Sequence, residues 1–288
     1  MTGVYKKTVI FLEMIKFSHT IFALPFAFSA AFLAANGLPS TRQLLFIALA
    51  MVGARTAAMS LNRLIDAKID AKNPRTATRA LPAGALSPAS VLIAIIASTG
   101  LLFYAAYQLN PLCFILSPVA LGFLVLYSYC KRFTSLAHVV LGICLAGAPI
   151  GAWIALRGSI DPPAITLGLL VLFWVAGFDI LYALQDLSFD RESGLHSIPV
   201  KFGVQGSLWT ARIFHLLTVV LFFLLMQQLS LGSWFLAGII CMTGMLLYEH
   251  WLLRAGDLNK LDAAFFTMNG YISITFLVST VLDIFLKG

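Results

Sequence analysis

The chain has 288 residues, of which 60% are hydrophobic and only 11% are charged. A soluble domain is about 45–50% apolar and about 25% charged, and a water-soluble core of this size would not hide so much apolar surface. The composition excludes a soluble enzyme, a disordered chain and a disulfide-stapled secreted module, and it predicts an integral membrane protein. The net charge of +7 does not indicate a nucleic-acid partner, because excess Lys and Arg report topology in membrane proteins.

Nine apolar windows follow one another along the chain. They cover residues 17–35, 43–61, 88–108, 111–129, 135–156, 164–184, 207–228, 232–253 and 264–286. Each is long enough, at about 1.5 Å per residue, to cross an apolar layer of about 30 Å as a helix. Because the windows are continuous and do not alternate, helices are expected rather than barrel strands. The sequence therefore predicts an all-α integral membrane protein with nine transmembrane helices.

The basic residues are distributed unequally between the two sides of this arrangement. With a cytoplasmic N-terminus, 16 of the 19 lie on the inner side: Lys6, Lys7, Lys16, Arg55, Arg63, Lys68, Lys72, Arg75, Arg79, Lys131, Arg132, Arg191, Lys201, Arg212, Arg254 and Lys260. The outer side holds only Arg42, Arg157 and Lys287. This asymmetry predicts an N-in, C-out topology.

Two acidic motifs share the spacing D-x-x-x-D. Residues four apart lie on one helix face, so each motif forms a stripe. The first stripe is Asn62, Asp66 and Asp70, and the second is Asp179, Tyr182, Asp186 and Asp190. Corresponding aspartates, Asp66 with Asp186 and Asp70 with Asp190, are 120 residues apart in both cases. The equal separation indicates one domain over residues 1–288 with two divergent halves, roughly 1–130 and 131–288.

Carboxylates stacked on one face near an apolar boundary repel one another, so a cation is expected between them. Hard oxygen ligands suit Mg²⁺, which is shared between protein acids and substrate phosphates. Basic residues lie near both motifs along the chain, at Lys68, Lys72, Arg75, Arg79, Lys131, Arg132, Arg191 and Lys201. Acids, metal and bases together predict a diphosphate site. Topology and helix capping also place charges at helix ends, but they give no reason for duplicated acids.

Four segments carry a family resemblance: Asn62-Arg63-x-x-Asp66-x-x-x-Asp70, Asn73-Pro74-Arg75-Thr76-x-x-Arg79-Ala80-Leu81-Pro82-Ala83-Gly84, Asp179-x-x-Tyr182-x-x-Gln185-Asp186-x-x-x-Asp190 and Gly194-Leu195-His196-Ser197-Ile198-Pro199. With them, the chain resembles over nearly its whole length the UbiA superfamily of intramembrane prenyltransferases, in particular its bacterial 4-hydroxybenzoate polyprenyltransferase-like branch. The resemblance implies nine helices around a central cavity, across which the two motifs bind the diphosphate of an isoprenyl donor through Mg²⁺.

The resemblance also implies roles for single residues. The expected metal ligands are Asn62, Asp66, Asp70, Asp186 and Asp190, and the four aspartates among them are the expected catalytic residues. The expected diphosphate ligands are Lys16, Asn62, Arg75, Arg79, Lys131 and Arg132. Tyr182 and Asp179 are expected to contact the acceptor or to stabilise the allylic cation. His19, His138 and His196 are candidate acceptor contacts, although a lone His is more often structural.

The implied reaction is Mg-dependent transfer of a polyprenyl chain from polyprenyl diphosphate to a small aromatic acceptor, 4-hydroxybenzoate, in respiratory quinone biosynthesis. The implied location is the cytoplasmic (inner) membrane of a bacterium, among membrane lipid, with the site facing the cytoplasm. Arg63 stands where many ubiquinone-pathway members carry Asp, so 1,4-dihydroxy-6-naphthoate, in futalosine-route menaquinone synthesis, is an alternative acceptor.

Two alternatives from other classes stay open. An ion-coupled transporter also uses intramembrane acids and internal repeats, although its acids are expected near mid-membrane rather than at helix ends. An assembly protein without catalysis would show no metal dependence. Magnesium-dependent diphosphate binding separates the prenyltransferase from both.

Overall fold

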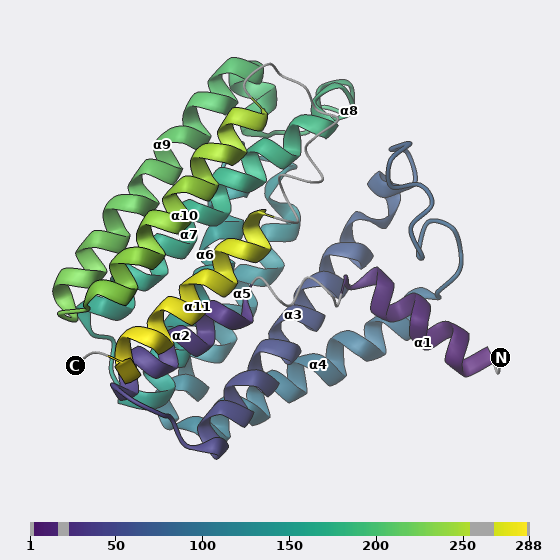
Figure 1. Ribbon diagram of the computed structural model, residues 1–288. Coiled ribbons are helices and arrows are strands. Elements are labelled where there is room, and N and C mark those ends of the chain that lie inside the picture. Colours follow the sequence, from purple (N-terminus) through teal and green to yellow (C-terminus); the bar gives the residue numbers. More distant parts are fainter. Residues whose placement is uncertain (1–2, 17–22, 254–267, 287–288) are drawn as a thin grey trace.

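The computed structural model describes residues 3–16, 23–253 and 268–286, and in these residues it is helical, with turns and no strand (Figure 1). Within these described residues, eight helices are long and apolar enough to span a membrane. They are α3 (Thr41–Asp70), α4 (Pro88–Leu109), α5 (Pro111–Cys130), α6 (Ala137–Arg157), α7 (Pro162–Tyr182), α9 (Ile198–Gln228), α10 (Ser233–Leu252) and α11 (Asn269–Leu286). Shorter helices are α1 (Gly3–Met14), α2 (Leu24–Ala35) and α8 (Leu187–Glu192).

The predicted all-helical membrane fold is confirmed, and eight of the nine apolar windows coincide with long apolar helices. The first window is described only from residue 23, where it contains the 12-residue apolar helix α2, and residues 17–22 lie outside the described part. The count of nine spans and the N-in, C-out orientation therefore stay predictions.

Helix boundaries follow local capping chemistry that hydropathy windows do not detect. Ser40 begins α3 with a capping box, in which its side chain accepts from the Gln43 backbone and the Gln43 side chain accepts from the Ser40 backbone. Ser197 caps α9, which therefore begins nine residues before the window at 207. Gly203 interrupts α9 with φ 66°, a left-handed conformation that favours glycine, and this interruption kinks the helix.

Helix α7 occupies the centre of the bundle and packs against α6 on one side and α9 on the other. Apart from Asp179 near its C-terminal end it is almost wholly apolar, and most of its residues are buried, as expected for a helix at the centre of a bundle. Trp174 of α7 contacts Phe26 of α2, and Phe26 stacks on Phe276 of α11 with ring centroids 4.7 Å apart. These aromatic contacts pack α2, α7 and α11 together and so support the helix that carries Asp179 and Tyr182.

Close approach of α6 and α7 depends on Gly142. A Cβ atom at this position would lie 2.5 Å from the carbonyl oxygen of Leu172, whereas one at Gly147 on the same helix would meet nothing within 4 Å. We expect Gly142→Ala to force the two helices apart and to cost about 1–3 kcal/mol of stability. Thermal unfolding in detergent tests this expectation, with Gly147→Ala as the matched control. Equal unfolding midpoints for the two variants would show that α6 and α7 can move apart without loss of stability.

Candidate active site

A cavity of about 1350 Å³ lies between α3, α4, α5, α6 and α7. Its wall follows α5 from Cys113 to Lys131, about 27 Å at 1.5 Å per residue. Apolar and small side chains such as Leu109, Leu116 and Ala148 line the part far from the acidic motifs. Charged side chains line the other end, which carries Asp70 and Asp186 and is called the motif end. One cavity therefore joins a charged region to a long apolar region.

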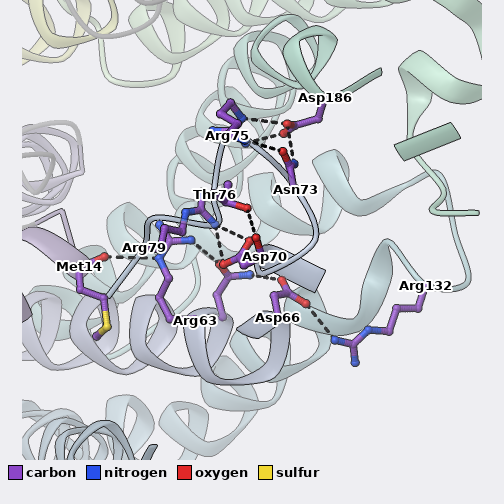
Figure 2. A network of polar contacts seen from close by, with 11 residues as sticks. Met14, Arg63, Asp66, Asp70, Asn73, Arg75, Thr76, Arg79, Arg132 and Asp186 are labelled. Carbon is purple, nitrogen blue, oxygen red and sulfur yellow. Dashed lines mark hydrogen bonds and ion pairs between the residues drawn. The ribbon is translucent and has the colours of Figure 1, made fainter. Parts of the chain in front are cut away.

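Four ion pairs connect the segments that meet at the motif end. Asp186 accepts from Nε and Nη2 of Arg75, with 2.8 Å for the first contact, and Asp70 lies 2.7 Å from Nη1 of Arg79. The remaining pairs are Asp66 with Arg132, at 2.9 Å, and Asp190 with Lys131, at 3.2 Å. Figure 2 shows three of these pairs, which join α3 and the segment that follows it to Asp186 of the 183–186 turn and to Arg132, just after α5.

The segment after α3 is folded so that its polar side chains point back to the motifs. Thr76 donates to the backbone carbonyl of Asp70 at 3.0 Å, and the Asn73 side chain accepts from the backbone N–H of Arg75. Asn73 also donates to Asp186 at 3.2 Å, beside Arg75 (Figure 2). Asn73 and Thr76 are buried. These bonds hold Asn73 and Arg75 against Asp186 of the second acidic motif, which lies 111 residues after Arg75 along the chain.

The second acidic stripe is not continuous, which corrects the expectation that one helix face carries it. Helix α7 ends at Tyr182, a 3₁₀ helix covers Ala183–Asp186, and α8 begins at Leu187. The tighter 3₁₀ turn rotates the later residues relative to α7. Asp186 and Asp190 therefore face Arg75 and Lys131, whereas Asp179 faces His138 of α6, with 2.7 Å between Oδ2 and Nδ1.

Other predicted residues also line the cavity. Asn62 donates to Asp66 at 2.9 Å, so the amide and the carboxylate of the first motif are in contact. The Tyr182 ring lies 5.8 Å from the Arg75 guanidinium. Lys16 lines the cavity and makes no ion pair in the part of the chain that the structure describes. His196 is exposed and its backbone N–H donates to Lys131, while His19 lies outside the described residues.

Arg75 keeps its positive charge beside Asp186 despite partial burial. Burial lowers the pKa of the Arg75 guanidinium, but the hydrogen bonds and charge of Asp186 outweigh it and raise that pKa above its ordinary value. The four acids and four bases cancel in charge when each acid is ionised. An incoming anion and its counter-cation would exchange with these partners without leaving a buried charge uncompensated.

The donor set fits Mg²⁺ that is shared with a ligand rather than enclosed by protein. Among the described residues, no group of three or more His, Cys, Asp or Glu is placed to hold a metal. Mg²⁺ commonly takes one or two carboxylates and completes its octahedron with water and phosphate oxygens. Asp66 with Asp70, and Asp186 with Asp190, offer such oxygens from two sides of the motif end.

Sequence reasoning missed several polar residues of the cavity wall, because they lie outside the acidic stripes. Arg55 lies on α3 eleven residues before Asp66, and its Nε atom is buried without a hydrogen-bond partner among the described residues. Arg63 is 9% exposed and donates to Asn62, and Tyr127 of α5 lines the cavity. The signal for Arg55 was a charged residue inside an apolar window, because such a residue is by default a candidate for a functional site.

Comparison with known proteins agrees with this architecture. Residues 23–271 match the model of the UbiA prenyltransferase family. The chain is 30% identical over 258 residues to a 4-hydroxybenzoate octaprenyltransferase of Vibrio cholerae serotype O1, covering 88% of this chain and 89% of that protein.

Solved structures show the same fold. A UbiA homolog from Aeropyrum pernix K1, in its apo form, matches with a TM-score of 0.85 and 31% identity over 92% of this chain and 98% of that one. A UbiA homolog from Archaeoglobus fulgidus, bound to GPP and Mg²⁺, matches with a TM-score of 0.74 and 22% identity over 96% of this chain and 99% of that one. The chain belongs to the UbiA prenyltransferase family and is an integral membrane prenyltransferase.

Proposed function

We propose that the protein transfers a polyprenyl chain from polyprenyl diphosphate to 4-hydroxybenzoate, in respiratory quinone biosynthesis. The observation that carries the proposal is the single cavity with two chemically different ends. Its charged end suits a diphosphate, and its apolar length suits the attached chain. The relative from Vibrio cholerae that is named for this reaction supports the choice of acceptor.

Mg²⁺ is proposed as the cofactor, held by Asn62, Asp66 and Asp70 on one side and by Asp186 and Asp190 on the other. When bound, it neutralises the negative charge that grows on the diphosphate as the allylic C–O bond breaks. Arg75, Arg79, Lys131 and Arg132 exchange their carboxylate partners for diphosphate oxygens and stabilise the same charge. Lys16 is proposed as a further contact from the end of α1.

The allylic carbon becomes positive as the diphosphate leaves, and the cavity must protect it from water. Tyr182 presents a ring at the motif end, beside Arg75, and a ring face stabilises a cation. Apolar side chains from α4, α5 and α6 surround the prenyl chain and exclude water. The electron-rich carbon beside the acceptor hydroxyl then forms the new C–C bond.

Arg55 is proposed to bind the acceptor carboxylate. It lines the cavity about 16 Å from Asp66 along α3, toward the N-terminus of that helix, at 1.5 Å per residue. Its buried Nε has no partner, and its Nη2 donates only to the Lys16 carbonyl, at 3.3 Å, among the described residues. A half-buried guanidinium that lines a cavity and has no carboxylate partner favours an anionic ligand. Both 4-hydroxybenzoate and 1,4-dihydroxy-6-naphthoate carry a carboxylate.

The wider arrangement is part of the same proposal. We propose one domain over residues 1–288, built from two divergent halves whose acidic motifs face each other at the motif end. The positive-inside rule places that end at the cytoplasmic face of a bacterial inner membrane. The water-soluble acceptor would enter from that side, while the donor chain arrives from membrane lipid.

The test incubates the purified protein in lipid with a polyprenyl diphosphate and each of the two acceptors, with Mg²⁺ or with EDTA. We expect a prenylated 4-hydroxybenzoate by mass spectrometry with Mg²⁺, and its loss with EDTA. If only the naphthoate were prenylated, the proposed acceptor would change and the proposed reaction would stand. No product from either acceptor, with the donor left intact, would overturn the proposed function and favour a transporter.

A further inference from the structure

The residues of the four ion pairs have roles with the metal and the diphosphate, and none of them has been assigned to removing the ring proton of the acceptor. When the aromatic ring attacks the prenyl carbon, the substituted carbon must lose its hydrogen as a proton before the ring regains aromaticity. The carboxylates that line the cavity in the described part of the chain are Glu13, Asp66, Asp70, Asp179, Asp186 and Asp190. Each is a candidate proton acceptor.

Five of these candidates are poor proton acceptors in this reaction. The four motif aspartates each contact Arg or Lys, at distances up to 3.2 Å, so their carboxylate oxygens are already engaged in ion pairs. The proposed function also engages them with the metal. Glu13 is exposed, on α1. Asp179 differs from all of these, because its ion-pair partner is a histidine.

The geometry of Asp179 and His138 suits proton transfer. The Asp179 side chain is 19% exposed to the cavity, and the His138 side chain behind it is 1% exposed. The 2.7 Å contact joins Asp179 Oδ2 to His138 Nδ1, and His138 Nε2 is buried without a hydrogen-bond partner among the described residues. Because the carboxylate and the imidazole are in hydrogen-bond contact, a proton taken up by Asp179 stays within that contact and does not create an isolated buried charge.

The position of the pair along the cavity is also suitable. Asp179 precedes Asp186 by seven residues, one α-helical turn and one 3₁₀ turn, or roughly 11 Å. It therefore lies deeper in the cavity than the diphosphate site, toward the apolar part where the reacting ring must enter. Tyr127, Asp179 and Asp66 all line the same cavity.

We propose that Asp179 accepts the ring proton of the aromatic acceptor and that His138 positions Asp179 and shares this proton. The C–O electron pair leaves on diphosphate, a ring electron pair forms the C–C bond, and the electrons of the broken C–H bond return to the ring. The proton passes to the Asp179 carboxylate, hydrogen-bonded to His138, and later to water. This inference rests on the proposed function and assigns its last step.

The test compares 4-hydroxybenzoate with the same acid deuterated at both carbons beside the hydroxyl, in wild type, Asp179→Asn and His138→Gln. We expect both variants to bind the donor with Mg²⁺ as wild type does, while Asp179→Asn loses about 10²–10³-fold in kcat. Slowed proton removal should then limit turnover, so a primary deuterium isotope effect on kcat should appear in both variants and exceed that of wild type.

Asp161→Asn is the matched control, because Asp161 also contacts an α6 ring nitrogen, Trp153 Nε1 at 3.0 Å, but lies outside the cavity. It should keep wild-type kcat and isotope effect. Loss of kcat in Asp179→Asn and His138→Gln without an isotope effect, or turnover within about threefold of wild type, would overturn the role of the pair. An isotope effect in Tyr127→Phe alone would move the role to Tyr127. Absence of prenylation by wild type would instead overturn the proposed function.

Discussion

Asp186→Asn is expected to reduce prenyl transfer by at least about 10²–10³-fold, because it removes one carboxylate from the metal side of the diphosphate and leaves Arg75 without its ionic partner. Asparagine has the same size and can still accept from Arg75 and Asn73, so the fold should survive. Turnover and Mg²⁺-dependent binding of the donor, measured with purified protein in lipid, should both fall. Asp66→Asn should show the same two losses from the other motif.

The matched control for this prediction is Glu192→Gln, at the exposed end of α8 and outside the cavity. It changes the net charge by the same amount and should leave turnover unchanged. A folded Asp186→Asn protein with full turnover would contradict the assignment of the second acidic motif to the metal and the diphosphate.

Arg55→Gln is expected to raise the KM for 4-hydroxybenzoate by about 10–100-fold, because a hydrogen bond to a charged group contributes about 1.5–3 kcal/mol and each 1.4 kcal/mol is a factor of ten. Donor binding should change much less than the KM for the acceptor, since Arg55 lies about 16 Å from Asp66 along α3 and is linked to the donor site only through its hydrogen bond to the Lys16 carbonyl. The uncharged analogue 4-hydroxybenzamide should be used equally poorly by wild type and variant. Steady-state kinetics with both acceptors measures these effects.

Arg42→Gln supplies the control for Arg55, because Arg42 lies in the first turn of the same helix and outside the cavity. Its guanidinium donates to the Gln108 carbonyl at 2.7 Å. The KM for 4-hydroxybenzoate should stay at its wild-type value in this variant. An unchanged KM in Arg55→Gln, or an equal rise in both variants, would contradict a carboxylate contact at Arg55.

Much of the fold could be predicted because a membrane span has a simple physical requirement. About 20 apolar residues must form a helix, and eight of the nine windows coincide with helices of that kind. Exact boundaries could not be predicted from hydropathy, because they depend on caps such as Ser197 and on polar turns that continue a helix beyond the apolar layer. Helix α3, for example, continues to Asp70 and carries the first motif on its last turns.

The candidate site was predictable where spacing alone decides which side chains meet. Asn62 and Asp66, four residues apart on α3, are in contact as the helical spacing requires. The partners of the acids were not predictable, because contacts such as Arg75 with Asp186 and Lys131 with Asp190 depend on tertiary packing across many residues. The separate direction of Asp179 was also hidden, since the 3₁₀ turn at Ala183–Asp186 has no clear sequence signal.

The most direct test of the central claim is an experimental structure with a non-hydrolysable polyprenyl diphosphate analogue and Mn²⁺ in place of Mg²⁺, with the metal located by anomalous scattering. We predict metal density between the Asp66–Asp70 pair and the Asp186–Asp190 pair, diphosphate oxygens in contact with Arg75 and Lys131, and the prenyl chain along α5 toward Cys113. Metal or diphosphate density away from these carboxylates, with the four ion pairs intact, would contradict the account.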